Sequence, residues 1–259
     1  MPAAKNPASP EVEIIGSGTG IPSRKRGSPS ILVRAEGEIL LLDTGPCTLQ
    51  RLLTRDITYM DIDKIFYTHF HPDHCSDFVF ILFTMRHALP RRQKPLWVFG
   101  PPGLKELYDI HLRMHNEVVR AREYDLNLME LWEGEAIFNG WKVKASPLVH
   151  FVPDVGYRLE FSNGKSLVYS GDTEYCKNIV ELARDADLLI LECSFPEDLR
   201  MMNHLVPSLC GRIARESGCR RLLLTHFYPQ WEGRDILKEC RKFYSGELVL
   251  AEDNTQVVL

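Results

Sequence analysis

The sequence predicts an α/β fold in which buried strands alternate with helices. Apolar runs of strand length recur along the chain, for example at residues 188–191 and 221–225, and helical patterns such as residues 78–87 lie between such runs. Residues 139–140 and 163–164 are Asn-Gly pairs between alternating apolar residues, which predicts two tight β-hairpins. Several expected strands end directly before a histidine or an aspartate. We therefore expect the functional side chains at the ends of the strands.

The bulk composition favours one large domain. The chain has 259 residues, of which 44% are hydrophobic and 25% charged, enough to bury a large core. We expect residues 1–10, which include three prolines, to form a disordered leader and residues 11–259 to form the single domain. No apolar run approaches the ~20 residues of a membrane helix and no signal peptide is visible, so we expect a cytoplasmic protein without membrane contact.

The cysteines and the net charge limit which kinds of protein the chain can be. The seven cysteines are odd in number, scattered and never spaced as Cys-x-x-Cys, which indicates reduced thiols and no disulfide framework. The net charge of −4 gives no overall attraction to nucleic acid. Any binding of RNA must therefore come from local basic patches.

Residues 68–74 read Thr-His-Phe-His-Pro-Asp-His and directly follow an apolar strand. Residues two apart in an extended segment point the same way, so His69 and His71 can share one metal ion. Asp73 and His74 stand where the chain turns into a helical pattern and would face a second ion. Without metal, this cluster would leave several polar groups to be satisfied at considerable cost, so we favour a metal site over a polar loop.

The motif resembles the His-x-His-x-Asp-His signature of the metallo-β-lactamase superfamily. Later landmarks of that family recur in order, namely His150 after a strand, Asp172 within Ser-Gly-Asp-Thr and His226 within Leu-Thr-His-Phe. The resemblance implies an αββα sandwich, with mixed sheets, helices on the outer faces and a dinuclear site at one edge between the sheets. Two Zn²⁺ ions per chain are expected, with Mn²⁺ or Fe²⁺ as alternatives.

On this resemblance each ion receives three ligands and shares a fourth. The first ion is assigned His69, His71 and His150, the second ion is assigned Asp73, His74 and His226, and Asp172 bridges them. Two such ions lower the pKa of a water between them toward neutrality and hold a phosphoryl oxygen. Asp73 is expected to help orient or deprotonate that water. Asp43, which closes an apolar strand, is expected to hold ligand imidazoles in the right tautomer.

Within the superfamily the chain looks most like ribonuclease Z and related phosphodiesterases. His204 matches the histidine that donates the leaving-group proton in their Ala-His-Ser-Thr segment, although its neighbours differ. Glu192, at the end of a buried strand, is expected to hold that imidazole. The loop at residues 22–27 partly matches a Pro-x-Lys-x-Arg-Asn pattern, which in ribonuclease Z is associated with the substrate. Its three adjacent cations suit phosphate binding, and a solvated basic turn is the alternative.

One departure from ribonuclease Z concerns transfer RNA. In that enzyme a long arm rich in glycine and proline grips transfer RNA and leaves the body near the second hairpin. Here residues 156–172 pass through one tight hairpin with no room for an arm. The sequence therefore predicts a dinuclear-metal-dependent hydrolase of phosphodiester bonds, ribonuclease Z-like but armless. Its substrate would be RNA or a small cyclic phosphate, and a homodimer is compatible with the sequence.

The sequence gives weaker support to other functional hypotheses. A hydrolase of a lactone or thioester and a non-catalytic metal-binding scaffold remain as alternatives, although a scaffold should have lost ligands and all seven are present. A diiron redox protein would carry a motif glutamate and a flavin domain, neither of which is visible. The glycines of residues 16–20 lead into a proline instead of a helix, which excludes a dinucleotide loop. His111 and His115, four apart, indicate a solvated helix face rather than a zinc site.

Overall fold

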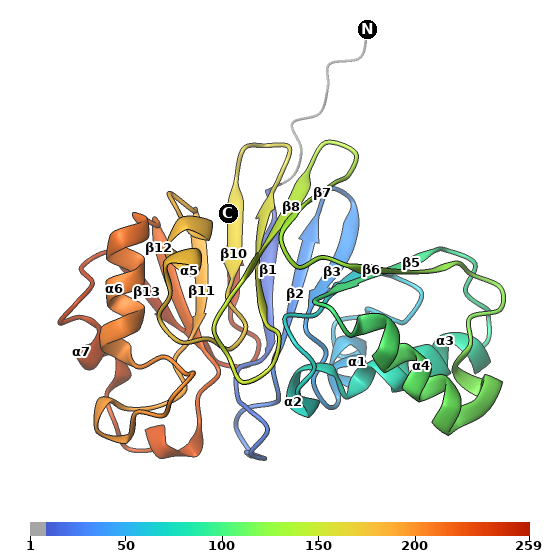
Figure 1. The fold of residues 1–259 in the computed structure, drawn as a ribbon, viewed down its shortest axis with the longest axis horizontal. Coiled ribbons are helices and arrows are strands. Elements are labelled where there is room, and N and C mark those ends of the chain that lie inside the picture. Colours follow the sequence, from blue (N-terminus) through green and yellow to red (C-terminus); the bar gives the residue numbers. More distant parts are fainter. Residues whose placement is uncertain (1–8) are drawn as a thin grey trace, which may run out of the picture.

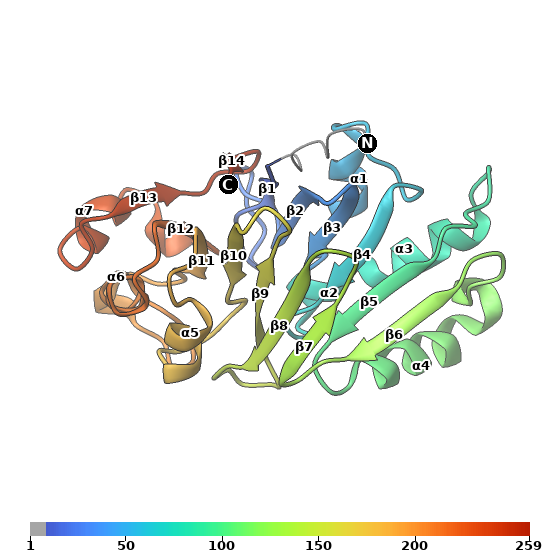
Figure 2. The same cartoon turned by 90° about the horizontal axis from the view of Figure 1, so that it is seen from above.

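Two mixed β-sheets of seven strands each lie face to face, and helices cover their outer faces (Figure 1, Figure 2). The structure is a computed structural model that describes residues 9–259. The view from above separates two groups of helices, one on each side of the paired sheets (Figure 2). This arrangement confirms the predicted αββα sandwich.

The strands are arranged so that the chain forms most of one sheet before the other. The first sheet contains, in spatial order, β14 (Gln256–Val258), β1 (Glu11–Gly16), β2 (Ser30–Ala35), β3 (Glu38–Leu42), β4 (Ile62–Phe66), β5 (Leu96–Gly100) and β6 (Leu126–Glu130). The second contains β13 (Glu247–Leu250), β12 (Arg221–Thr225), β11 (Leu188–Glu192), β10 (Ser166–Tyr169), β9 (Val155–Glu160), β8 (Lys142–Pro147) and β7 (Gly134–Ile137). The last strand, β14, returns to the first sheet and pairs with β1.

The helices follow the same division. The α-helices are α1 (Thr48–Leu53), α2 (Pro72–Cys75), α3 (Asp77–His87), α4 (Leu104–His115), α5 (Lys177–Leu182), α6 (Pro207–Ser217) and α7 (Ile236–Cys240). Short 3₁₀ turns are η1 (Asn116–Val119), η2 (Glu197–Leu199) and η3 (Pro229–Trp231). Helices α1, α3 and α4 pack on the first sheet, and α5, α6 and α7 pack on the second. No helix in residues 9–259 combines the length and apolar character needed to cross a membrane.

Strand alternation separates the core between the sheets from the cores beneath the helices. Leu40 and Leu42 of β3 belong to the cluster between the two sheets, whereas Leu41 belongs to the cluster beneath α1, α3 and α4. Successive side chains of a strand point to opposite faces, so a continuous apolar run can fill both layers. The buried strand positions are therefore mostly apolar, with exceptions such as Glu13 in β1 and Lys64 in β4, and the polar residues of interest lie where the strands end.

The parallel strands bring those ends to one edge. Strands β3, β4 and β5 run parallel in the first sheet, and β10, β11 and β12 run parallel in the second. Parallel strands place their carboxyl ends at a common edge. The predicted metal-binding motif follows β4, Asp172 follows β10, and His226 follows β12. The topology alone thus gathers these segments.

Most predicted elements are confirmed. Helix α1 begins at Thr48, because Cys47 takes a left-handed conformation (φ 69°) that turns the chain first. Helix α7 ends at Cys240, where the backbone continues into a hydrogen-bonded turn (Phe243 N to Cys240 O, 2.9 Å). Strand β6 was not predicted, since its residues are only partly buried and lack a clear apolar run. Both Asn-Gly hairpins are confirmed.

The described structure begins at Ser9, two residues before β1. Residues 1–8 of the predicted leader (1–10) lie outside the described residues. Pro10 is buried, and its carbonyl accepts a hydrogen bond from the Leu259 amide at 3.0 Å. The two described ends of the chain are therefore tied together beside β1 and β14.

Candidate metal centre

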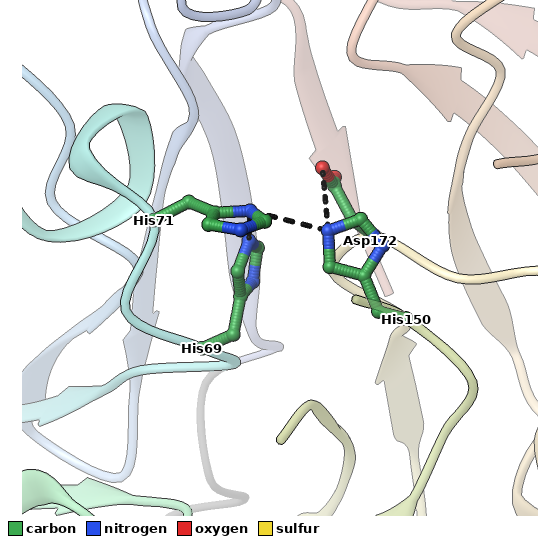
Figure 3. Close-up of side chains that lie close together, drawn as sticks. All are labelled: His69, His71, His150 and Asp172. Carbon is green, nitrogen blue, oxygen red and sulfur yellow. Dashed lines mark hydrogen bonds and ion pairs between the residues drawn. The ribbon is translucent and has the colours of Figure 1, made fainter. Parts of the chain in front are cut away.

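The structure brings all seven residues predicted as metal ligands together at the edge between the sheets. Ligand atoms of His69, His71, His150 and Asp172 lie within 4.8 Å of one another, and so do those of Asp73, His74 and His226. In Figure 3 the histidines of the first group come from two different loops and face one another, with the Asp172 carboxylate beside His150. The motif supplies four of the seven side chains, and three distant strand ends supply the rest.

In the first cluster three imidazole nitrogens converge. His69 Nε2 lies 3.0 Å from His71 Nδ1, and His150 Nε2 lies 3.2 Å from the same His71 atom (Figure 3). His69 and His71 stand two residues apart in the extended segment after β4, as the sequence predicted. Their rings are 4.7 Å apart between centroids, close enough to share one ion.

In the second cluster two more imidazoles meet a carboxylate. His74 Nε2 lies 3.3 Å from His226 Nε2, and Asp73 Oδ2 lies 3.6 Å from that His226 atom. Asp172 reaches both clusters. Its Oδ1 is 3.3 Å from His226 Nε2, and its Oδ2 is 3.9 Å from His150 Nε2. The two oxygens of one carboxylate thus face the two groups, which is the arrangement of a bridging ligand.

Hydrogen bonds on the outer side of the rings determine which nitrogen faces inward. Asp43 Oδ2 lies 2.8 Å from His74 Nδ1, and Asp43 also accepts hydrogen bonds from the Thr68 amide and the Tyr169 hydroxyl. The Asn203 carbonyl accepts a hydrogen bond from His150 Nδ1 at 3.0 Å. Since these partners are acceptors, the outer nitrogens carry the protons and the inner nitrogens carry lone pairs.

Two further supports were not among the predicted site residues. Asp154 Oδ2 lies 2.9 Å from His69 Nδ1, and the Ser194 hydroxyl lies 2.9 Å from His226 Nδ1. Asp154 opens the buried strand β9, so an acidic residue at a strand boundary was the available signal, the same signal that identified Asp43. The interaction of Ser194 depends on the neighbouring strands β11 and β12, which no local pattern reveals.

Burial keeps the first cluster neutral. Burial lowers the pKa of His69 well below its ordinary value, and burial also lowers the pKa of His71 and His150. Neutral imidazole is the form that binds a metal ion. The first cluster is therefore ready to donate lone pairs at neutral pH.

The second cluster is charged and favours a cation. Burial raises the pKa of Asp172, but His226 and His74 outweigh burial and hold it well below its ordinary value. Burial also raises the pKa of Asp73, yet the hydrogen bond with His226 and the charge of His74 lower it to about 2. Burial lowers the pKa of His74, and the carboxylates of Asp172 and Asp43 outweigh this and raise it well above its ordinary value.

These residues fit divalent metal ions. In the first cluster, inward-facing lone pairs of neutral imidazoles lie only 3.0–3.2 Å from one another, a contact that a cation between them relieves. Among residues 9–259 the buried Asp172 Oδ1 has no hydrogen-bond donor. A buried carboxylate oxygen without a partner is costly unless an ion satisfies it. Nitrogen and carboxylate oxygen together are the donor set of zinc and similar ions.

A histidine–glutamate pair lies beside the clusters. His204 Nδ1 is 2.9 Å from Glu192 Oε1, and the His204 ring centroid is 5.1 Å from that of His150. Glu192 is held in turn by the Thr173 amide at 2.8 Å and by the Ser194 hydroxyl. Burial lowers the pKa of His204, but Glu192 and then Asp172 outweigh burial and raise it to about 9. His204 is thus an imidazolium at neutral pH.

The basic loop at residues 22–27 divides into structural and exposed cations. The Arg26 guanidinium donates to the Ser17 hydroxyl at 2.7 Å and to the Ala251 carbonyl at 2.6 Å, and it lies 4.7 Å from the Phe227 ring centroid. Arg24 and Lys25 are exposed. The expectation of three cations free for phosphate is therefore wrong for Arg26, whose charge is used inside the protein.

A glycine beside Asp172 and the histidine pair of α4 complete the description of the site and its surroundings. Gly171, beside Asp172, has φ 63°, and a Cβ atom there would lie 2.5 Å from Thr68 Cβ, so glycine is required for the two sheets' loops to meet. The His111 and His115 rings stack 6.0 Å apart between centroids. In the part of the chain that the structure describes, they join no cluster of three metal-binding side chains.

Comparison with known proteins places this geometry in a family. A model of the β-lactamase superfamily domain matches residues 39–227, and the chain therefore belongs to the β-lactamase superfamily. It is 26% identical to ribonuclease Z of Methanosarcina acetivorans, across 93% of this chain and 95% of that protein. It is 27% identical to ribonuclease Z of Archaeoglobus fulgidus, across 94% of this chain and 95% of that protein.

Solved structures of similar proteins share this fold. The metallo-β-lactamase fold protein YhfI from Bacillus subtilis has a TM-score of 0.85 at 22% identity, covering 97% of this chain and 100% of that chain. The short form of human tRNase Z has a TM-score of 0.78 at 25% identity, covering 95% of this chain and 98% of that chain. The predicted resemblance to ribonuclease Z within this superfamily is confirmed.

Proposed function

We propose that this protein is a metal-dependent hydrolase of phosphodiester bonds. The observation that carries the proposal is the relation between the two ligand clusters and His204. Asp172 lies between the clusters, and His204 is charged, is held by Glu192 and stands next to His150 without belonging to either set of histidines. The ribonuclease Z relatives support the same reaction class.

The ligand roles follow the two clusters. His69, His71 and His150 would hold one ion, Asp73, His74 and His226 would hold a second, and Asp172 would bridge them. When bound, a pair of divalent ions, Zn²⁺ in this proposal, supplies Lewis-acid chemistry that acidifies water and neutralises charge on a phosphoryl oxygen. The outer supports, Asp43, Asp154, Ser194 and the Asn203 carbonyl, keep the imidazoles oriented for that task.

The chain's own residues move the protons. Hydrolysis forms a phosphorus–oxygen bond to water and breaks the bond to the leaving alcohol, whose oxygen needs a proton as it departs. His204 carries that proton at neutral pH, and Glu192 holds the imidazolium in place. Asp73, a carboxylate with a pKa of about 2, can accept a hydrogen bond from the attacking water and orient it.

The substrate in this proposal is a small phosphodiester or a short RNA end rather than a whole transfer RNA. The alignment with the Methanosarcina acetivorans enzyme runs over 297 residues, whereas 93% of this 259-residue chain is about 241, so about 56 aligned positions hold no residue of this chain. Strands β9 and β10 are joined by residues 161–165 only. Both observations support an enzyme without the arm that grips transfer RNA.

A substrate panel tests the proposal. The purified protein would be assayed for metal content and for hydrolysis of bis-p-nitrophenyl phosphate, cyclic nucleotides, precursor transfer RNA and a lactone. We expect hydrolysis of the phosphodiesters and none of the lactone. Turnover of the lactone alone would favour the alternative non-phosphate hydrolase. Bound metal without turnover of any substrate would favour a binding scaffold.

A further inference from the structure

We propose that the metal centre has an apolar subsite that binds an uncharged, apolar leaving group of the substrate. We call this surface the apolar rim. It consists of exposed hydrophobic side chains from two loops, Val149, Phe151, Leu199, Met201 and Met202. The inference rests on the proposed function, because it names the class of phosphodiester that the site would cleave.

The rim side chains are exposed far beyond what packing requires. Phe151 is 63% exposed, Met201 is 53% exposed and Met202 is 73% exposed. Single exposed hydrophobic residues are common, but a contiguous group beside a polar site marks a binding surface. Methionine and phenylalanine also adapt well to apolar ligands, because methionine is flexible and the aromatic ring offers a large flat face.

Hydrogen bonds join the two loops of the rim. His150 Nδ1 donates to the Asn203 carbonyl at 3.0 Å, which holds the segment after Met202 against the segment before Phe151. The Glu174 amide donates to the Val149 carbonyl at 2.8 Å, and Arg200 donates to Glu174 at 2.8 Å, so a third segment ties both loops. The two loops that carry the rim side chains are therefore held together by the fold.

The rim borders the reacting end of the site. The Phe151 ring centroid lies 5.4 Å from that of His150, and the His150 centroid lies 5.1 Å from that of His204. His204 is the proton donor of the proposed reaction. A leaving group that receives its proton from His204 must extend away from the phosphorus on this side, where Phe151 packs next to His150.

The charged residues differ between the apolar rim and the loop that carries Arg24 and Lys25. Arg200, the cation between Leu199 and Met201, is paired with Glu174 at 2.8 Å, which offsets its charge. Beside the second cluster, the glycine-rich loop packs on Asp73, since a Cβ atom at Gly20 would lie 3.3 Å from the Asp73 carboxyl carbon. That loop continues to the exposed cations Arg24 and Lys25. An anionic group therefore suits the side of Arg24 and Lys25, and an uncharged apolar group suits the rim.

A pair of diesters with matched leaving-group chemistry tests this assignment. Thymidine 5′-(2-phenylethyl phosphate) and thymidine 5′-(ethyl phosphate) both release a primary alcohol, and they differ in apolar size. We expect the phenylethyl diester to have a kcat/KM about tenfold higher, the effect of burying one apolar side group. We also expect the products to be phenylethanol and thymidine 5′-phosphate, because the alcohol should leave on the His204 side.

Substitutions in the apolar rim test whether it causes the preference for the phenylethyl diester. Phe151→Ser and Met202→Ser should each reduce the ratio of the two kcat/KM values toward one, while Phe151→Leu should retain it. Phe80→Ser changes a side chain that is 51% exposed on α3, away from the rim, and should leave the ratio unchanged. Calorimetry with phenylethylphosphonate and ethylphosphonate gives a second readout without turnover, with the same order of affinities expected.

The outcomes separate the two proposals. Hydrolysis of both diesters at equal kcat/KM, or unchanged ratios in both serine variants, would overturn the apolar rim and leave the phosphodiesterase intact. Release of thymidine in place of phenylethanol would also overturn it, since the leaving group would then lie on the other side. Hydrolysis of neither diester, nor of bis-p-nitrophenyl phosphate, would overturn the proposed function and the rim with it.

Discussion

The carboxylate of Asp154 lies 2.9 Å from Nδ1 of His69, and both side chains are fully buried. Burial raises the pKa of Asp154 well above its ordinary value, and the nearby carboxylates of Asp172 and Asp43 add to this effect. Within residues 9–259, the Asp154 oxygens accept no hydrogen bond of regular geometry, so the ion-pair contact with His69 is what holds them. Asp154 therefore depends on His69, and the orientation of His69 depends on Asp154.

Removing this support should weaken metal binding. Asp154→Ala is expected to lower zinc affinity by ~10–100-fold, the usual effect of losing a partner that orients a ligand histidine. Asp154→Asn keeps an oxygen that can accept the hydrogen bond and should cost less. Competition with a chromophoric chelator measures both. Wild-type affinity in the alanine variant would mean that Thr68, whose hydroxyl lies 3.0 Å from His69 Nδ1, suffices by itself.

The bridging position of Asp172 predicts a joint loss of metal and activity. The protein purified without chelator should contain close to two transition-metal ions per chain, since the Asp172 carboxylate has one oxygen near His226 of one cluster and the other near His150 of the other. Asp172→Ala should lose metal and phosphodiesterase activity together, as measured by elemental analysis and turnover of bis-p-nitrophenyl phosphate. Asp109→Ala, an exposed aspartate on α4, is the matched control. Metal content near zero in the wild-type protein would refute the dinuclear site.

His204→Ala should separate proton donation from metal binding. The variant should keep its metal and fold but lose ~10²–10⁴-fold in kcat on diesters with alkoxide leaving groups, the range of general acid catalysis. A nitrophenolate leaves without a proton, so the same variant should hydrolyse bis-p-nitrophenyl phosphate almost normally. His115→Ala, an exposed histidine on α4, controls for loss of a histidine. Equal losses on both substrates, or loss of metal, would instead assign His204 a structural or ligand role.

Precursor transfer RNA should be a poor substrate relative to small phosphodiesters. The body carries a net charge of −4, and of the three cations in the basic loop Arg26 is bound internally. Binding of a polyanion would rest on a few exposed cations and should be weak. Cleavage rates at 50 and 200 mM salt would be compared, concentrations chosen at about the range over which phosphate contacts lose affinity. Efficient cleavage with steep salt dependence would reveal another RNA-binding surface.

Because Arg26 is bonded inside the protein and Lys25 is exposed, replacing Arg26 should lower the free energy of unfolding more than replacing Lys25. Arg26→Ala removes hydrogen bonds to Ser17 and Ala251 and should lower the free energy of unfolding by about 1–3 kcal/mol, because buried acceptors lose their donor. Lys25→Ala removes an exposed side chain and should stay within about 0.5 kcal/mol of wild type. Urea unfolding measures both. Equal effects would mean that Arg26 is replaced by water without cost.

The sequence alone determined the elements whose cause is local. The two Asn-Gly hairpins and the extended segment carrying His69 and His71 depend on neighbouring residues, so their pattern is legible in the chain. The family signature then indicated which distant residues join the centre. The sequence does not show where α1 begins or where α7 ends, because the turn at Cys47 and the end of α7 depend on local backbone geometry that composition does not reveal.

Only the tertiary structure decided which side chains meet across the two sheets. Asp154 and His69 stand 85 positions apart by their numbers, and their contact exists because β9 of one sheet lies against the end of β4 of the other (Val155 N to Thr68 O, 3.0 Å). The same packing directs Arg26 inward and brings Phe151 and Met202 to one rim. No local pattern contains this information, because it arises from strand order and sheet stacking, which place residues from separate loops at a common edge.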